Sequence, residues 1–202
     1  MSHLACADDD ESPLNAQQFA LFAEHVAHTG LEKSLLSSAA LYNFSEQTDD
    51  WIRPGLAIYG CSPFKTGVGA ELGLKPVMTV SSRLLQVKHC RAGQTIGYGA
   101  RYHCPEDMPI GIVAMGYADG FPREIDGSAR VLVDERLVPV IGRVSMDTFV
   151  VDLRPCSVVK PGDTVLIWGA DNPIEQLAAA ANTISYTLLV GVGRQRAEYY
   201  YV

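Results

Sequence analysis

The amino-acid sequence predicts an α/β segment followed by an all-β domain. In residues 1–70, a segment with the apolar spacing of a helix lies between strand-like runs. Residues 74–202 instead contain short β-type runs separated by glycine, proline and aspartate. Between them, at residues 64–75, three glycines interrupt the hydrophobic pattern. We therefore expect two domains, at residues 1–70 and 74–202.

In the first segment the spacing of apolar residues predicts one helix over residues 15–29, which Gly30 ends. The strand-like runs are residues 1–7, 33–36 and 51–60, and a loop begins at residue 37. This order of strands and helix is typical of a parallel α/β barrel or sheet, but it contains too few strands to close a barrel.

The second segment contains six β-type runs. They are residues 79–90, 110–115, 129–133, 137–141, 144–153 and 164–168. One helix follows them, with Asn172 as N-cap, Pro173 at its first position and the run IEQLAAAAN behind it. The close spacing of the short strands predicts an all-β domain.

Composition and charge exclude several classes of protein. With 202 residues, 48% of them hydrophobic and 19% charged, the chain can bury a core and is not disordered as a whole. The net charge of −7 argues against a nucleic-acid binder, which normally presents a basic face. No run approaches the roughly 18 apolar residues of a membrane span, and the N-terminus lacks the pattern of a secretory signal. We expect an acidic, soluble protein of the cytoplasm.

The cysteines are Cys6, Cys61, Cys90, Cys104 and Cys156. Their odd number and the absence of a CxxC pair argue against a disulfide framework and fit a reducing compartment. The dipeptides His89-Cys90 and His103-Cys104 are compatible with a metal site. Ordinary strand and loop residues are the better interpretation, because neighbours in a strand point to opposite faces. No metal is expected.

Four segments combine glycine with aromatic or charged residues: 53–56, 95–100, 115–123 and 142–147. Such mixtures at strand ends often belong to binding or catalytic loops. From the residues alone, each segment also has a structural explanation. Tyr98 can end a strand beside a β-bulge, and Asp119-Gly120 can form a tight turn. Arg143 can take part in an ion pair at a strand end, and Arg53 can reach solvent.

Taken together, these segments resemble one family. RPGLAIYG at 53–60, GYGARY at 97–102, MGYADGFPR at 115–123 and GRVSMDTFVVDL at 142–153 resemble, in this order, motifs of the fold-type III pyridoxal-phosphate alanine racemases. The opening MSHLACADDD and the late TISY are similar to the same family, whereas residues 194–202 differ from its pattern. The resemblance implies the last elements of a (β/α)8 barrel followed by the family's C-terminal β domain.

The resemblance also implies pyridoxal 5′-phosphate as cofactor. Arg53 matches the arginine that meets the pyridine nitrogen, and His3 matches the histidine that supports it. A guanidinium does not give up its proton near neutral pH, so it keeps that nitrogen unprotonated and discourages transamination. The positions that match the phosphate contacts are Ser38, the backbone at Gly55 and Leu56, and Tyr186. Ser37 stands where many members carry asparagine, a difference that we expect to be tolerated.

The same resemblance implies the catalytic groups. Tyr98 matches the tyrosine that is the base for the L-enantiomer, and a phenol with an ordinary pKa near 10 needs cationic neighbours for that task. Met146 matches the residue whose backbone N–H meets the substrate carboxylate. The positions that match the lining of the substrate channel are Tyr117, Asp8, Arg123, Arg143 and Ile184.

The family's cofactor-binding lysine, which forms the Schiff base and is the second proton carrier, has no counterpart among the lysines of this chain. We therefore expect the C-terminal part of an alanine racemase, an isomerase that supplies D-alanine for peptidoglycan. We expect it to be inactive alone and to act on alanine as a homodimer or with a companion N-terminal chain.

Two alternatives stay open. A non-catalytic dimerisation or cofactor-binding remnant of a split racemase gene would also lack the lysine. A related fold-type III amino-acid decarboxylase would share the domain pattern, but the Cys-Glu-Ser-like segment of those enzymes does not occur in this β domain.

Overall fold

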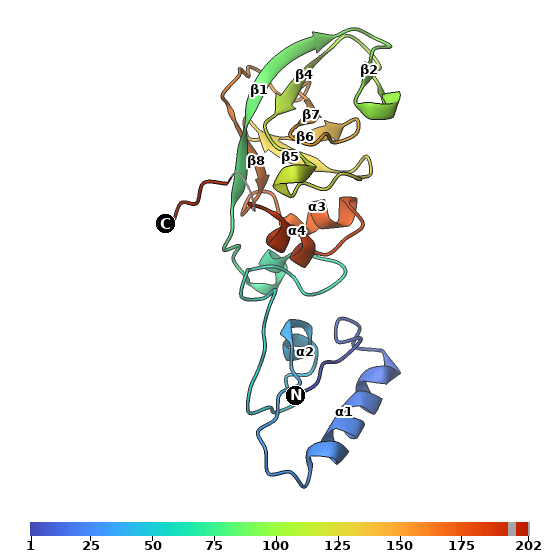
Figure 1. Cartoon of the computed structure of the whole chain (residues 1–202), viewed down its shortest axis with the longest axis vertical. Helices are drawn as coiled ribbons and strands as arrows, with labels where there is room; N and C mark the ends of the chain where they lie inside the picture. Colours follow the sequence, from blue (N-terminus) through green and yellow to red (C-terminus); the bar gives the residue numbers. More distant parts are fainter. Residues whose placement is uncertain (194–196, 202) are drawn as a thin grey trace. The chain divides into compact units, whose positions relative to one another are not determined.

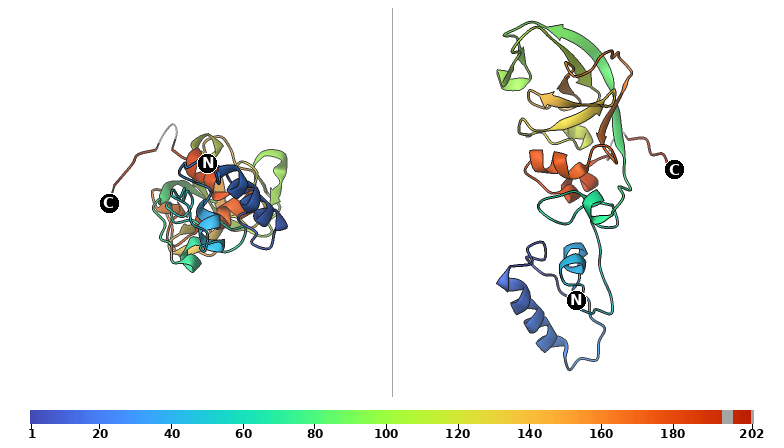
Figure 2. Two further views of the ribbon diagram at one scale, coloured as in Figure 1. Left: turned by 90° about the horizontal axis from the view of Figure 1, so that it is seen from below. Right: turned by 180° about the vertical axis from the view of Figure 1, so that it is seen from behind.

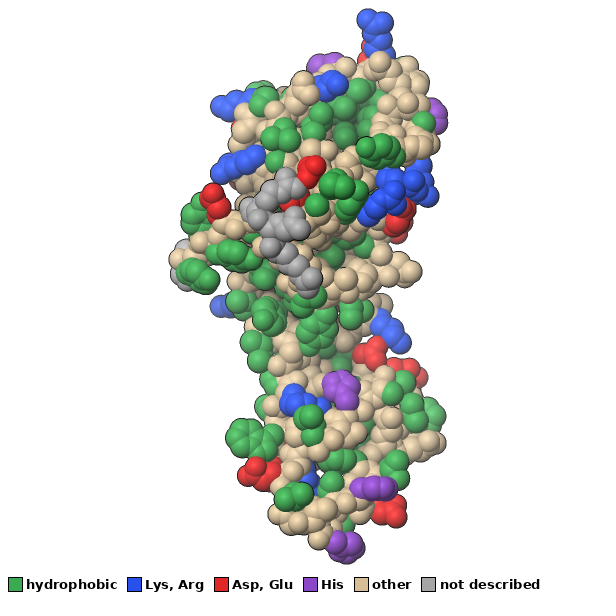
Figure 3. Space-filling model, viewed as in Figure 1, with side chains coloured by type: hydrophobic (Ala, Val, Ile, Leu, Met, Phe, Trp, Pro, Cys, Tyr) green, Lys and Arg blue, Asp and Glu red, His purple; other side chains and the backbone are tan. Residues whose placement is uncertain are grey.

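The computed structural model describes residues 1–193 and 197–201. The chain divides into two compact units, Met1–Val77 and Met78–Val202, and each has its own buried apolar cluster. None of the helices in the described ranges is long and apolar enough to cross a membrane. Hydrophobic side chains are also exposed on the surface of both units (Figure 3).

The second unit contains a closed antiparallel β-barrel (Figures 1 and 2). Its strands, in barrel order, are β1 (Val80–Cys90), β4 (Met108–Val113), β7 (Phe149–Asp152), β6 (Arg136–Ile141), β5 (Arg130–Val133) and β8 (Thr164–Trp168). The long strand β1 closes the barrel, because residues 80–83 pair with β8 and residues 84–90 pair with β4. All six predicted β runs are confirmed, and the β-rich fold class with them.

Alternation of buried and half-exposed positions along β4 and β5 directs side chains into the barrel. The fully buried side chains include Val131, Val133, Val138, Val151, Val165 and Ile167. Phe121 stacks on Phe149 with ring centroids 4.4 Å apart.

One predicted run is too long. Strand β7 begins only at Phe149, because residues 144–148 form a loop in which the Ser145 N–H donates to the Thr148 carbonyl at 2.9 Å.

Two helices, α3 (Ile174–Ala180) and α4 (Ser185–Gly191), follow the last barrel strand in the sequence and contact each other. Helix α3 is as predicted, but its N-cap is Pro173 rather than Asn172. The Asn172 amide is buried and donates instead to the carbonyls of Ile167 at 2.7 Å and Arg130 at 3.3 Å. This amide therefore links two barrel strands, which satisfies its donors better than an exposed cap.

The sequence patterns did not predict helix α4 or the short hairpin of β2 (Thr95–Ile96) and β3 (Tyr102–His103). A seven-residue helix and two-residue strands are too short to show a hydrophobic period. The hairpin matters for the site, because it carries Tyr98 at its tip, inside a 3₁₀ turn over Tyr98–Ala100.

The first unit contains α1 (Pro13–Val26), close to the predicted helix, and α2 (Ser38–Asn43), where a loop was expected. Phe19 and Phe22 of α1 pack against a buried cluster that includes Leu4, Leu35 and Ala40. The apolar face of α1 therefore supplies one wall of this small core.

The strands expected at residues 1–7, 33–36 and 51–60 are wrong: no β-strand forms within residues 1–77, all of which are described. The backbones of the three runs share only scattered hydrogen bonds, such as Ser2 N–H to the Ser34 carbonyl at 3.1 Å, and an isolated bridge from Ser37 to Arg53. The expectation of barrel elements in residues 1–70 is not confirmed.

Competing hydrogen bonds explain the missing strands. The N–H groups of Leu35 and Leu36 donate to the Asp49 carboxylate, so they are not available to a neighbouring strand. In the third run, Pro54 has no N–H, and residues 55–60 follow with consecutive turn bonds. Apolar composition suggested strands, but the backbone donors are already taken.

Candidate active site

Three loops of the second unit meet at the residues expected to carry catalysis. Gly97 lies so close to the loop of Arg143 that a Cβ atom on Gly97 would be 2.7 Å from the backbone nitrogen of Arg143. The N–H groups of Tyr117 and Ala118 donate to the carbonyls of Ser145 at 3.1 Å and Met146 at 2.9 Å. The structure therefore brings together the segments of Tyr98, Tyr117, Arg143 and Met146, which are up to 48 positions apart in sequence.

The side chains at this junction point outward. Tyr98 is 68% exposed and Met146 is 54% exposed. Gly97 and Gly99 have φ angles of 77° and 74°, a backbone that turns sharply on both sides of Tyr98. The glycines therefore let the backbone present an exposed Tyr98 just beyond the end of β2.

The loop before Arg123 is also held internally. Gly116 N–H donates to the Asp119 carboxylate at 3.0 Å, and Gly120 takes a φ of 96° as its N–H meets the Tyr117 carbonyl. The tight-turn explanation of Asp119-Gly120 therefore holds. It complements the functional one, because the turn presents Tyr117 and Arg123 with the guanidinium 6.0 Å from the tyrosine ring.

Glu124 was not among the expected site residues. Its carboxylate lies between three arginines: Arg123 at 2.6 Å, Arg101 at 3.0 Å and Arg143 at 3.4 Å. The Arg143 side chain is mostly buried, and its Nη1 lies 4.0 Å from where a Cβ on Gly99 would be. The Arg143 guanidinium, ion-paired with Glu124, thus lies beside the residue next to Tyr98. The only sequence signal for Glu124 is its place directly after Arg123.

Arg53 and His3 meet in the first unit. The Arg53 guanidinium donates to the Ser34 hydroxyl and the Ser2 carbonyl, both at 2.5 Å, and lies 3.3 Å from Nδ1 of His3. No carboxylate of the described residues forms an ion pair with it. A half-buried cation held by uncharged partners can still serve a hydrogen-bond acceptor of a ligand.

Ser38 lies at the start of α2, where its hydroxyl meets the backbone that follows Arg53. Its Oγ accepts hydrogen bonds from the N–H groups of Gly55 at 2.7 Å and Ala57 at 3.3 Å. Hydroxyl and backbone donors of this kind, gathered in one turn, suit a phosphate group. Leu56, between those two residues, is buried.

The remaining expected residues divide between the units. Asp8 of the first unit forms an ion pair with Lys65 at 3.6 Å. Ile184 and Tyr186 belong to the N-terminal end of α4 in the second unit, where both are exposed. The divergent C-terminal stretch includes residues 194–196 and 202, which lie outside the described residues. Within the described ranges, no group of three or more histidine, cysteine or acidic side chains is arranged to hold a metal.

Comparison with protein families gives two matches that together span most of the chain. The alanine racemase C-terminal domain matches residues 77–201, and the alanine racemase N-terminal domain matches residues 1–63. Among curated proteins, an alanine racemase of Nitrosococcus oceani is 48% identical over 192 residues, 95% of this chain and 54% of that protein. An alanine racemase of Piscirickettsia salmonis is 47% identical over 76% of this chain and 92% of that protein.

Solved structures show the same similarity. The biosynthetic alanine racemase from Pseudomonas aeruginosa has a TM-score of 0.91 and 38% identity, covering 96% of this chain and 54% of that chain. The alanine racemase from Bartonella henselae, with covalently bound pyridoxal phosphate, has a TM-score of 0.84 and 29% identity, covering 95% and 53%. The chain thus spans about half the length of the first curated relatives that it matches.

Proposed function

Because this chain belongs to the alanine racemase family, we propose that it supplies the β-domain half of an alanine racemase active site, which interconverts L- and D-alanine with pyridoxal 5′-phosphate. The observation that carries the proposal is the junction of three loops that presents Tyr98 outward beside Arg143. A proton carrier that serves a site completed by other residues must face away from its own core.

Tyr98 would take and return the proton at the substrate Cα on one face. Its phenol oxygen is reachable, because the side chain is largely exposed. Arg143, whose guanidinium lies next to Gly99, would provide a positive charge beside this residue. Glu124 would hold that guanidinium in place.

Met146 would orient the substrate through its backbone. None of the described residues accepts a hydrogen bond from the Met146 N–H, whereas its carbonyl is already bound by Ala118. That N–H can therefore serve the carboxylate of alanine. The family resemblance further implies that Tyr117, Arg123, Arg143 and Ile184 of the second unit, and Asp8 of the first, would line the substrate channel.

The residues of the first unit fit pyridoxal phosphate, which supplies an electron-accepting ring that stabilises negative charge at the substrate Cα. Arg53, held by His3 and neutral oxygens, would donate to the pyridine nitrogen without protonating it. Ser38 and the backbone at Gly55 and Leu56 would hold the phosphate. The family resemblance also implies Tyr186 of the second unit as a phosphate contact.

We propose that the site is completed by a second copy of the whole protein or by a companion N-terminal chain, which provides the lysine that serves the other face. The chain alone would then be inactive, and the complete enzyme would supply D-alanine for peptidoglycan in the cytoplasm.

Reconstitution tests the proposal. The chain is co-expressed with the part of the Nitrosococcus oceani relative that precedes the matched region, and D-alanine formation from L-alanine is measured with added cofactor. We expect turnover from the pair and none from either piece. Cofactor binding without turnover in a folded pair would instead favour the non-catalytic remnant, and release of CO₂ from an amino acid would favour the decarboxylase.

A further inference from the structure

Two of the five free cysteines lie together at the base of the Tyr98 hairpin. Cys90 is the last residue of β1, Cys104 directly follows β3, and both side chains belong to one apolar cluster. Cys104 is a buried member of this cluster, and Cys90, which is only partly buried, packs against it. The two thiols therefore share one small apolar cluster in the folded chain.

The backbone fixes both positions. Cys90 lies opposite Met108 in the β1–β4 ladder. The Cys104 N–H donates to the Gln94 carbonyl, and its own carbonyl accepts from the Gly93 N–H, both at 2.8 Å. Neither cysteine sits on a free loop end, so the fold keeps both residues at this cluster.

We propose that Cys90 and Cys104 form a reversible disulfide, a redox modification site that ties together the two ends of the hairpin carrying Tyr98. This goes beyond the proposed racemase function and does not depend on it. The other cysteines differ: Cys6 and Cys61 belong to the first unit, and the Cys156 thiol meets the Val133 carbonyl at 3.5 Å.

The oxidant is a low-molecular-weight disulfide. The Cys90 thiolate attacks one of its sulfurs, which forms a mixed disulfide and releases one small thiol. The Cys104 thiolate then attacks the Cys90 sulfur and releases the second small thiol. Two protein thiols are oxidised, one small disulfide is reduced, and the two protein protons leave with the released thiols.

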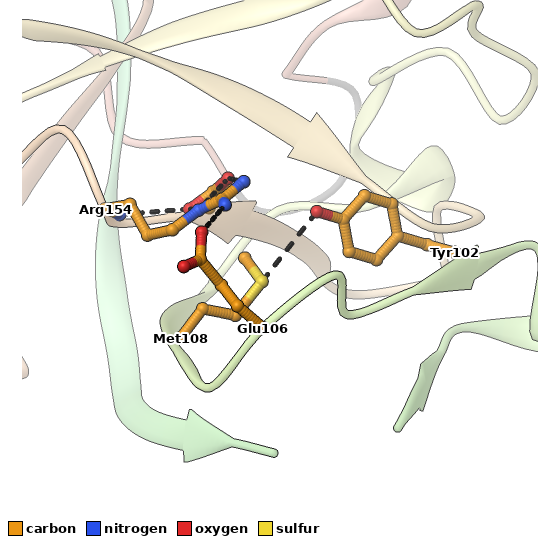
Figure 4. A network of polar contacts seen from close by, with 5 residues as sticks. Tyr102, Glu106, Met108 and Arg154 are labelled. Atoms are coloured by element: carbon orange, nitrogen blue, oxygen red, sulfur yellow. Dashed lines mark hydrogen bonds and ion pairs between the residues drawn. The ribbon is translucent and has the colours of Figure 1, made fainter. Parts of the chain in front are cut away.

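The surroundings determine the order of attack. Burial raises the pKa of the Cys104 thiol, the Cys90 thiol and then Asp152 raise it further, and the Arg154 guanidinium partly offsets this. Arg154 is itself held by Asp152 at 2.6 Å and by Glu106 in the network of Figure 4. In the same view, the Tyr102 hydroxyl points to the Met108 sulfur at 3.8 Å. Cys104 is therefore the second nucleophile, and closure becomes faster as the pH rises.

The consequence concerns the hairpin. A bond from residue 90 to residue 104 closes a loop that contains β2, Tyr98 and β3. Closing this loop restricts the unfolded chain, so the oxidised protein should unfold at a higher temperature by about 5–10 °C.

Peptide mapping tests the site directly. The full chain is equilibrated at pH 8 with oxidised and reduced glutathione, quenched with an alkylating agent and digested with trypsin. Cleavage after Lys88, Arg91 and Arg101 places the two cysteines on separate peptides. We expect these two peptides joined, a mass loss of about 2 Da in the intact chain, and a rise in the unfolding temperature that a reductant reverses.

Matched variants make the outcome decisive. Cys90→Ser should abolish the cross-link and the temperature shift, whereas Cys156→Ser should keep both. Because Cys90 is only partly buried, its replacement should leave the fold intact even if Cys104→Ser does not. The proposal is overturned if Cys90 is found only as the mixed disulfide with glutathione. It is also overturned if Cys90 and Cys104 are both recovered as alkylated, unoxidised thiols while Cys156 has reacted with glutathione.

Discussion

Gly97 and Arg143 are in direct backbone contact: a Cβ atom on Gly97 would lie 2.7 Å from the Arg143 nitrogen and 3.2 Å from its carbonyl oxygen. Gly142, the residue before Arg143, makes the reciprocal approach to the Ile96 carbonyl. Glycine on both sides therefore lets the Tyr98 hairpin sit against the loop of Arg143 and Met146. The orientation of Tyr98 depends on this contact rather than on packing of its own exposed ring.

Gly97→Ala should separate the hairpin from that loop. The new methyl group would meet immobile backbone, and the φ of 77° disfavours alanine, so we expect a loss of about 2–4 kcal/mol in the free energy of unfolding. Urea unfolding measures it. Gly93→Ala is the matched control, because Gly93 has nearly the same φ, 78°, but nothing within 4 Å. Equal losses in both variants would mean that the close approach contributes nothing.

Tyr98→Phe should remove the proton carrier in the reconstituted enzyme while leaving the fold unchanged. General acid–base groups typically contribute about 10²–10⁴-fold to a rate, so kcat for L-alanine should fall by that order. The unfolding temperature should stay constant, since Tyr98 is 68% exposed. Tyr117→Phe serves as control and should change kcat much less. Undiminished turnover of Tyr98→Phe would falsify the assignment of the base.

Arg53→Lys keeps the positive charge but replaces a group that does not protonate the pyridine nitrogen with one that can. Lysine loses the planar fork that reaches both Ser34 and Ser2, and an ammonium can give up a proton where a guanidinium cannot. In the reconstituted enzyme we expect slower racemisation and measurable transamination, detected as pyruvate formed from alanine. Absence of pyruvate together with full racemase activity would show that Arg53 has no such role.

Alkaline pH should destabilise the second unit. Burial raises the pKa of the Cys104 thiol and of the Tyr102 phenol above their values in an unfolded chain. The unfolded state therefore loses these protons first, and the stability present below about pH 8.5 is lost as the pH rises toward the raised values. Urea unfolding from pH 7.5 to 10.5, with reductant present, should show this decline. Cys104→Ala should flatten the slope; an identical slope would contradict the attribution to the thiol.

The second unit could be predicted from sequence largely because its strands are short, alternating and bounded by turn residues. Residues 79–90 and 164–168 became β1 and β8 almost unchanged. The first unit could not be predicted in the same way, because Asp49 takes the backbone donors of residues 35 and 36, and this contact depends on a turn that no periodicity reveals. Apolar content alone cannot distinguish a strand from an extended segment whose donors are occupied.

Some residues of the candidate site could be predicted from the sequence and one could not. Motif resemblance pointed to Tyr98, Arg143 and Met146, and the structure places their segments together. The same resemblance gave no reason to single out Glu124, whose partners Arg101 and Arg143 come from different loops. A contact that depends on three loops meeting is visible only after the chain has folded.

Glu124→Gln should therefore reveal how much the arginines depend on that carboxylate. Glutamine keeps the shape but removes the charge that pairs with the mostly buried Arg143. Because Glu124 itself is half exposed and screened by solvent, we expect a modest loss of about 0.5–1 kcal/mol in the free energy of unfolding, which shrinks as salt is added. Glu135→Gln is the matched control, since Glu135 is exposed and forms no ion pair among the described residues. If both variants show the same stability and the same salt dependence, Glu124 does not hold Arg143, and the guanidinium beside Gly99 must be fixed by other contacts.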